Sequence, residues 1–143
     1  MGSPRYLYRV FDDQSVSKWD EDDGFIAGWP DRPFDPSRHG ARKVVEEHMD
    51  WSNRTLTPFI SATSSPQKAV QYARQREEMG RSGVFIAEID ATRGRLSIYH
   101  MQSLVRSTRA YVPPEGWNKY EYLILREIPT EAIISISTWD EGV

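Results

Sequence analysis

Three polar residues with chemically useful side chains lie far apart in the sequence, at Arg9, Ser61 and Glu121. A guanidinium presents a fork of donors that matches phosphate oxygens, and a fixed carboxylate stabilises positive charge that develops on a sugar during glycoside cleavage. Each residue also has an ordinary explanation. Arg9 could be a strand residue facing water, Ser61 an ordinary strand residue, and Glu121 a strand-end charge paired with Lys119.

Several large enzyme classes are excluded by the motifs that the sequence lacks. It has no G-x-S-x-G elbow, no H-E-x-x-H helix, no phosphate-binding G-x-x-x-x-G-K-[ST] loop and no G-x-G-x-x-G after a strand. The absence of cysteine excludes thiolate nucleophiles and cysteine-ligated zinc. Three histidines, His39, His48 and His100, fall on different expected elements, and zinc needs three or four converging ligands. We therefore expect no metal.

An acidic run, Asp20 to Asp23, is the other conspicuous polar feature. It lacks the alternating spacing and the closing glutamate of a calcium loop, which favours a solvated acidic loop over a cation site. Binding of a hard cation remains the alternative.

The net charge of -3 over 143 residues argues against nucleic acid or an anionic membrane as a partner. No apolar run approaches the roughly 20 residues of a membrane span, and no signal-peptide pattern precedes the first expected strand. We expect a soluble single domain over residues 1–143, either cytoplasmic or a secreted effector whose signal has been removed.

The hydrophobic pattern predicts an α+β fold with mainly antiparallel strands and with its helices early in the chain. A long loop, residues 12–36, surrounds a short apolar piece at residues 25–27. One helix is expected over residues 37–49, and a second begins where Ser65 offers an N-cap hydroxyl before Pro66 and ends near Gly80. Strands are expected at residues 5–11, 56–63, 84–90, 96–99, 121–128 and 132–138.

These elements occur in an order that resembles one known family. The segments "LYRV", "FISAT" followed by "PQKAVQYA", "GVFIAEID" and "YEYLILREIP" are similar to the arginine-serine-glutamate class of ADP-ribosyltransferases, the cholera-toxin-like branch. Small fungal, toxin-like domains of that class are the nearest in appearance. The resemblance spans roughly residues 6–134, and its most specific motif is the strand-serine-helix segment.

The resemblance implies a fold of two abutting small sheets with NAD held in the cleft between them. It implies that Arg9, with its neighbour Val10, contacts NAD, and that Ser61 holds the nicotinamide ribose. Thr63 takes the second hydroxyl position of that motif, and Glu121 becomes the catalytic carboxylate. Aromatic rings at Phe59, Tyr72 and Phe85 are candidates to sandwich the nicotinamide, although core packing suits at least two of them better.

One departure from the family pattern concerns the acceptor. Arginine-modifying members carry a glutamate two residues before the catalytic one, where this chain has Lys119, which cannot take a proton from a guanidinium. If the alignment is displaced, Glu115 and Glu127 are the nearest alternative carboxylates. The sequence thus predicts a mono-ADP-ribosyltransferase with a macromolecular acceptor, for which a protein is one candidate. An NAD glycohydrolase and a non-catalytic interaction module of the same fold are the alternatives.

Overall fold

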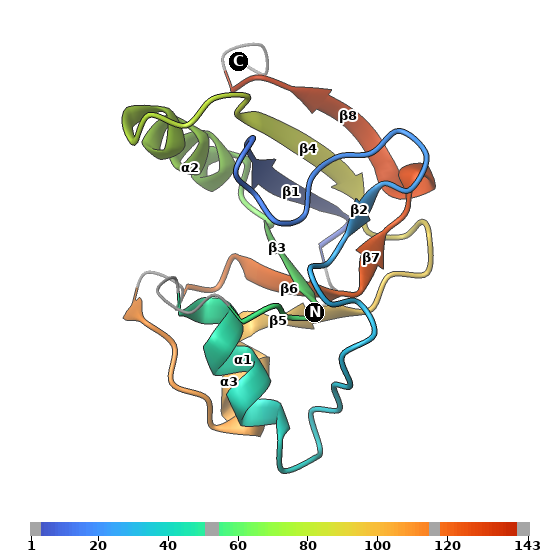
Figure 1. Ribbon diagram of the computed structural model, residues 1–143, viewed down its shortest axis with the longest axis vertical. Helices are drawn as coiled ribbons and strands as arrows, with labels where there is room; N and C mark the ends of the chain where they lie inside the picture. The colour runs from blue at the N-terminus through green and yellow to red at the C-terminus, as the bar shows by residue number, and fades with distance from the viewer. Residues whose placement is uncertain (1–3, 51–54, 115–117, 140–143) are drawn as a thin grey trace.

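The computed structural model describes residues 4–50, 55–114 and 118–139, and these form a mixed α/β fold around antiparallel strands (Figure 1). Six strands form one sheet in the order β5-β6-β3-β1-β4-β8, and β2 pairs with β7 in a separate ribbon. Every strand pair is antiparallel, as the sequence predicted. The strands are β1 (Tyr6–Phe11), β2 (Phe25–Ile26), β3 (Phe59–Thr63), β4 (Phe85–Asp90), β5 (Ile98–His100), β6 (Glu121–Leu125), β7 (Glu127–Ile128) and β8 (Ile133–Ser137).

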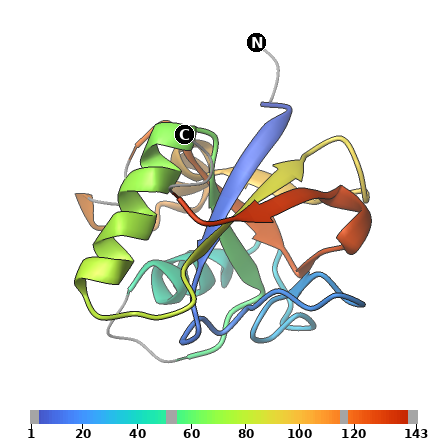
Figure 2. The same ribbon diagram turned by 90° about the horizontal axis from the view of Figure 1, so that it is seen from above.

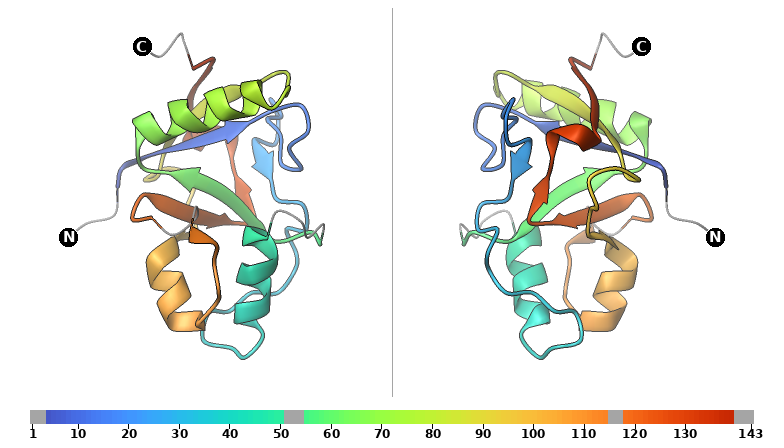
Figure 3. Two further views of the ribbon diagram at one scale, coloured as in Figure 1. Left: turned by 90° about the vertical axis from the view of Figure 1, so that its left-hand side faces the viewer. Right: turned by 90° about the vertical axis from the view of Figure 1, so that its right-hand side faces the viewer.

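The six-stranded sheet nearly divides in two between β1 and β3. These neighbours are in register at a single position, Tyr8 opposite Thr63, whereas β1 and β4 pair along six residues and β3 and β6 along five. The halves β5-β6-β3 and β1-β4-β8 therefore diverge from a narrow junction, which Figure 3 shows from two sides. This arrangement approaches the expected pair of abutting sheets, but the two halves remain one hydrogen-bonded sheet.

Helices cover the two halves separately (Figure 1). Helix α2 (Pro66–Glu78) buries Ala69 and Ala73 against Val10 of β1 in an apolar cluster. Helices α1 (Ala41–Met49) and α3 (Met101–Thr108) pack on the other half, where Val45 and Leu104 join Leu123 of β6 in a second cluster. Seen from above, α2 runs along one side of the molecule, away from the β2-β7 ribbon (Figure 2).

A central core joins the halves. It contains apolar side chains from most strands and from the β2-β7 ribbon, including Leu7, Phe25, Ile60, Ile89 and Ile128, none more than 1% exposed. Its continuity across the junction holds the two halves at a fixed angle, because an apolar core of this kind is densely packed.

The structure differs from the sequence-based expectation in two places. The helices do not all lie early in the chain, because α3 follows β5 directly and uses Met101 and Leu104 as its buried face. The expected strand over residues 121–128 is interrupted at Arg126, whose positive φ of 72° turns the chain so that β6 joins the main sheet and β7 joins β2.

Candidate functional site

Strand β3 places the two predicted hydroxyl residues on one face of the sheet. Successive strand residues point to opposite faces, so Ser61 and Thr63 share a face with Phe59, while Ile60 and Ala62 enter the central core. The chain then turns into α2, where the hydroxyl of Ser65 caps the helix by accepting from the N–H of Lys68 at 3.1 Å. The predicted N-cap is confirmed, and it belongs to Ser65 alone.

Glu121 is the first residue of β6 and lies directly opposite Thr63 in the β3-β6 pair. Its Oε1 accepts a hydrogen bond of 2.6 Å from the hydroxyl of Tyr72 in α2. Burial raises the pKa of this carboxyl group, against the opposing effects of hydrogen bonds from Tyr72 and Asn118 and of the positive charge of Lys68. The result is a sheltered carboxylate held by a neutral donor.

Arg9 extends from β1 across the junction to β3. Its two terminal nitrogens donate to backbone carbonyls, that of Ser61 at 3.1 Å and that of Ser17 at 2.7 Å, and its guanidinium lies over the ring of Phe25. Burial lowers the pKa of Arg9 to about 9, so the group stays charged near neutral pH. Its Nε is buried and has no hydrogen-bond partner among the described residues.

The structure adds His48, which the sequence had not connected with the other site residues. Its Nε2 lies 2.8 Å from the hydroxyl of Ser61, and its Nδ1 lies 2.6 Å from the hydroxyl of Thr57. Burial, and then the nearby charge of Arg9, lower the pKa of His48 to about 4, so the ring is neutral at pH 7. A neutral imidazole between two hydroxyls donates through one nitrogen and accepts through the other.

A sequence signal for His48 was present but weak. The residue occupies the last turn of α1, the element that precedes β3 in the chain. Its contact with Ser61 depends on how α1 packs against the sheet, which no spacing rule predicts.

Two other predicted residues do not present side chains at this cluster. Val10 is 7% exposed and packs against α2, and Phe85 lies on β4 with its ring 5.9 Å from that of Phe11. Phe59 is 3% exposed and packs edge to face on the ring of His48, at 5.6 Å, and on that of Phe34, at 4.7 Å. Of the three aromatic candidates, Tyr72 is the one that bonds the Glu121 carboxylate, and it does so through its hydroxyl.

Of the two alternative carboxylates, Glu127 is the one that lies within the described residues. Glu127 lies in the β2-β7 ribbon opposite Ile26 and is exposed, whereas Glu115 lies outside the described residues. The Lys119 ammonium group lies over the ring of Tyr120, 5.3 Å from its centre. Of the two candidates that the structure describes, Glu121 is therefore the carboxylate that lies opposite Thr63.

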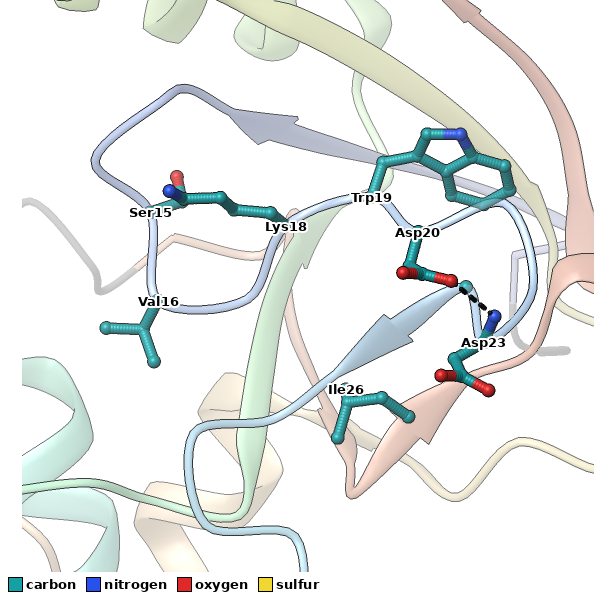
Figure 4. Close-up of a pocket in the computed structure, with 8 residues that line it drawn as sticks. Ser15, Val16, Lys18, Trp19, Asp20, Asp23 and Ile26 are labelled. Atoms are coloured by element: carbon teal, nitrogen blue, oxygen red, sulfur yellow. Dashed lines mark hydrogen bonds between the residues drawn. The ribbon is translucent and has the colours of Figure 1, made fainter.

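A shallow hollow of about 450 Å³ lies beside the loop between β1 and β2 (Figure 4). Trp19, Asp20 and Ile26 are among its lining residues, but Arg9, Ser61 and Glu121 are not. The Asp20 carboxylate accepts from the N–H groups of Asp22 and Asp23, so this acidic run is folded onto its own backbone. Within the described residues, no group of three or more metal-ligating side chains comes together.

The strands, helices and junction together define an ADP-ribosyltransferase-like fold. The structure is similar to that of EcPltA, a typhoid-toxin-like ADP-ribosyltransferase subunit, with a TM-score of 0.60 and 17% sequence identity over 93% of this chain and 74% of that one.

By sequence, residues 2–142 match the family described as domain of unknown function DUF7587, and the chain belongs to that family. No curated protein matches the chain significantly. Within the described residues, no helix has the length and apolar character needed to span a bilayer.

Proposed function

We propose that the protein cleaves the bond between nicotinamide and ribose in NAD and transfers ADP-ribose to an acceptor. The observation that carries this proposal is that a guanidinium, two hydroxyl residues and a carboxylate lie on the neighbouring strands β1, β3 and β6 of one sheet. Arg9 reaches the backbone of Ser61, and Thr63 on the same strand faces Glu121. The fold shared with an ADP-ribosyltransferase supports the same chemistry.

Glu121 has the central role in this proposal. As the bond to nicotinamide breaks, its electron pair leaves with the neutral nicotinamide ring and positive charge develops on the ribose. A fixed carboxylate stabilises that charge more strongly in a sheltered site than in water. No acid is needed for the leaving group, which suits a site whose histidine is neutral at pH 7.

The remaining residues orient the sugar and the phosphates. The hydroxyl of Ser61, fixed by His48, is placed to bind the ribose, and this restraint lowers the entropic cost of reaching a reactive geometry. Arg9 keeps β3 in place through the Ser61 carbonyl and supplies positive charge for a phosphate oxygen.

The acceptor forms its bond to the ribose carbon and loses a proton. Lys119 stands where arginine-specific enzymes of the resembling class place a carboxylate, and its ammonium group cannot take that proton. We therefore favour water, or a side chain other than arginine, as the acceptor.

Release of nicotinamide from NAD by the purified protein tests the proposal. Glu121→Gln keeps the side-chain volume and removes the charge, so we expect turnover to fall about a thousandfold with NAD binding nearly unchanged. Glu127→Gln, which alters an exposed glutamate of the β2-β7 ribbon, is the matched control and should retain activity. The proposal fails if the wild-type protein releases no nicotinamide and binds no NAD.

A non-catalytic interaction module is the second candidate. Two observations favour it: backbone carbonyls already occupy both terminal nitrogens of Arg9, and the hollow in Figure 4 is not lined by Arg9, Ser61 or Glu121. In that case NAD neither binds nor turns over, and Glu121→Gln changes nothing measurable.

A further inference from the structure

The hydrogen bond between Tyr72 and Glu121 links two segments that are 49 residues apart. Tyr72 lies in the second turn of α2, one turn after Lys68, and both residues influence the Glu121 carboxylate from the same helix. Ala69 and Ala73 on the adjoining face of α2 are buried against the sheet. The packing of these small side chains therefore fixes the distance between the Tyr72 hydroxyl and the carboxylate.

The direction of this bond follows from the proton that the Tyr72 phenol keeps. Burial, and then the bond to Glu121, raise the pKa of Tyr72 to about 12, so the phenol keeps its proton at any pH at which the enzyme would work. An ionised carboxylate has only acceptor sites. Tyr72 is therefore the donor and Glu121 the acceptor.

We propose that Tyr72 is a positioning residue that orients Glu121 and keeps it ionised for catalysis, instead of stacking on the nicotinamide ring. This inference rests on the proposed NAD cleavage. A sheltered carboxyl group tends to take up a proton, and a protonated Glu121 could not stabilise a cationic ribose. The phenol opposes that tendency without adding a positive charge that would compete with the sugar.

Every described group that acts on Glu121 belongs to one of three elements. Helix α2 supplies Tyr72 and Lys68, β3 supplies the hydroxyl of Thr63, and the segment before β6 supplies the amide of Asn118. Tyr72 has the largest of the effects that lower the Glu121 pKa. Its removal should therefore shift the carboxyl pKa more than removal of any other single partner.

Tyr72→Phe is the decisive variant, because it deletes one oxygen and keeps the ring. We expect kcat for nicotinamide release to fall about tenfold to a hundredfold, the range typical of a lost hydrogen bond to a charged group, with KM for NAD changed less than about twofold. The acid limb of the pH-rate profile should move to higher pH, since Glu121 then binds a proton more readily.

Tyr8→Phe provides the matched control. Tyr8 packs against the same apolar cluster as Tyr72, and its hydroxyl likewise bonds a carboxylate, that of Glu88 on β4. We expect this variant to keep both kcat and the position of the acid limb. A general loosening of the cluster would affect both variants alike and would count against the positioning role.

Tyr72→Leu separates positioning from stacking. If Tyr72 stacks on nicotinamide, Tyr72→Phe is neutral and Tyr72→Leu raises KM, an outcome that would overturn the inference. If Tyr72 positions Glu121, both variants lower kcat and move the acid limb to the same extent.

A measurement without NAD distinguishes failure of this inference from failure of the proposed function. Titration of the ¹³C-labelled Glu121 carboxyl group by NMR should give a higher pKa in Tyr72→Phe than in the wild type. An unchanged pKa refutes the role of Tyr72 whether or not the protein is active. A raised pKa in a protein that releases no nicotinamide refutes instead the catalytic proposal on which the inference rests.

Discussion

Two acids, the buried Asp12 and the half-buried Glu121, take partners from the same helix and yet differ in charge balance. The side chain of Asp12 is fully buried and forms ion pairs with Arg76 of α2, at 2.7 Å, and with Arg81, at 3.3 Å. Glu121 accepts a hydrogen bond from Tyr72, which lies one helical turn before Arg76 in α2. One acid is neutralised by cations, whereas the other is held mainly by neutral donors.

The pKa values of Asp12 and Glu121 shift in opposite directions because of this difference. Burial alone would raise the pKa of Asp12, but the N–H of Gln14 and the charges of Arg76 and Arg81 outweigh it and lower the pKa. For Glu121 burial prevails and the pKa is raised. An acid whose charge is neutralised by arginines contributes to the stability of the fold. An acid without a strong counter-charge can instead interact electrostatically with a ligand. We therefore assign Asp12 to stability and Glu121 to chemistry.

The largest expected effect on stability comes from Asp12→Asn. Loss of the charge leaves Arg76 and Arg81 without their shared partner, and breaking such a buried pair typically costs 3–5 kcal/mol. Because these arginine side chains are 33% and 30% exposed and can turn to solvent, we expect a loss of about 2–3 kcal/mol in the free energy of unfolding, measured in urea.

Two variants sharpen the Asp12 result. Asp90→Asn is the matched control, because Asp90 is equally buried but its partners Arg5 and Arg93 are both 62% exposed, so we expect a loss below about 1 kcal/mol. Glu121→Gln should not lower the free energy of unfolding at neutral pH, since it removes a charge whose burial is unfavourable. If Glu121→Gln destabilised the fold as much as Asp12→Asn, the distinction between the two acids would be lost.

The next effect concerns His48 and the response of stability to pH. Its pKa falls from the ordinary 6.5 to about 4 on folding, so the folded state disfavours the protonated ring. The stability that depends on a neutral His48 is complete above pH 6.5 and is lost as the pH falls toward 4. Asp12 acts in a lower window, below its ordinary pKa of 3.8, because its folded pKa is depressed.

His48→Gln should remove the upper of these two pH dependences. We expect the wild type to lose about 2 kcal/mol between pH 6.5 and 4 from this group, less than the full shift implies because the ring is partly exposed. In His48→Gln this loss should be absent, whereas His39→Gln, at an exposed position, should keep the wild-type slope. Urea unfolding at several pH values provides the measurement, and equal slopes in all three proteins would contradict the prediction.

Local sequence signals predicted most of the fold. Alternation in residues 5–11 and the Ser65-Pro66 start of α2 depend on neighbouring residues alone, and the structure confirms both. Helix α3 was missed because it is short and because His100, at its N-cap, makes no side-chain capping bond. The break at Arg126 was missed because an arginine with positive φ has no sequence signature of its own.

The sequence identified candidate site residues, but it did not predict their hydrogen-bond partners. Arg9, Ser61 and Glu121 were identified by family resemblance, and the structure places them on the neighbouring strands β1, β3 and β6, with Arg9 bonded to the Ser61 carbonyl and Glu121 opposite Thr63. The partners that determine their behaviour, His48 for Ser61 and Tyr72 for Glu121, depend on how helices return onto the sheet. Such contacts between distant segments follow from tertiary packing, which no local pattern encodes.

The smallest effect is expected from Lys68, the cationic neighbour of Glu121. Lys68→Met keeps an unbranched apolar stem and removes the charge that lowers the Glu121 pKa. We expect the acid limb of nicotinamide release to rise by a few tenths of a pH unit, less than in Tyr72→Phe, because a partly exposed charge is screened by water and salt.

Raising the salt concentration should move the wild-type limb toward that of the variant and leave the variant unchanged. Since a cation in the first turn of a helix opposes the helix dipole, the free energy of unfolding should increase slightly in Lys68→Met. If Lys68→Met moved the limb further than Tyr72→Phe, the cation and not the phenol would control Glu121, and this site would resemble that of Asp12 after all.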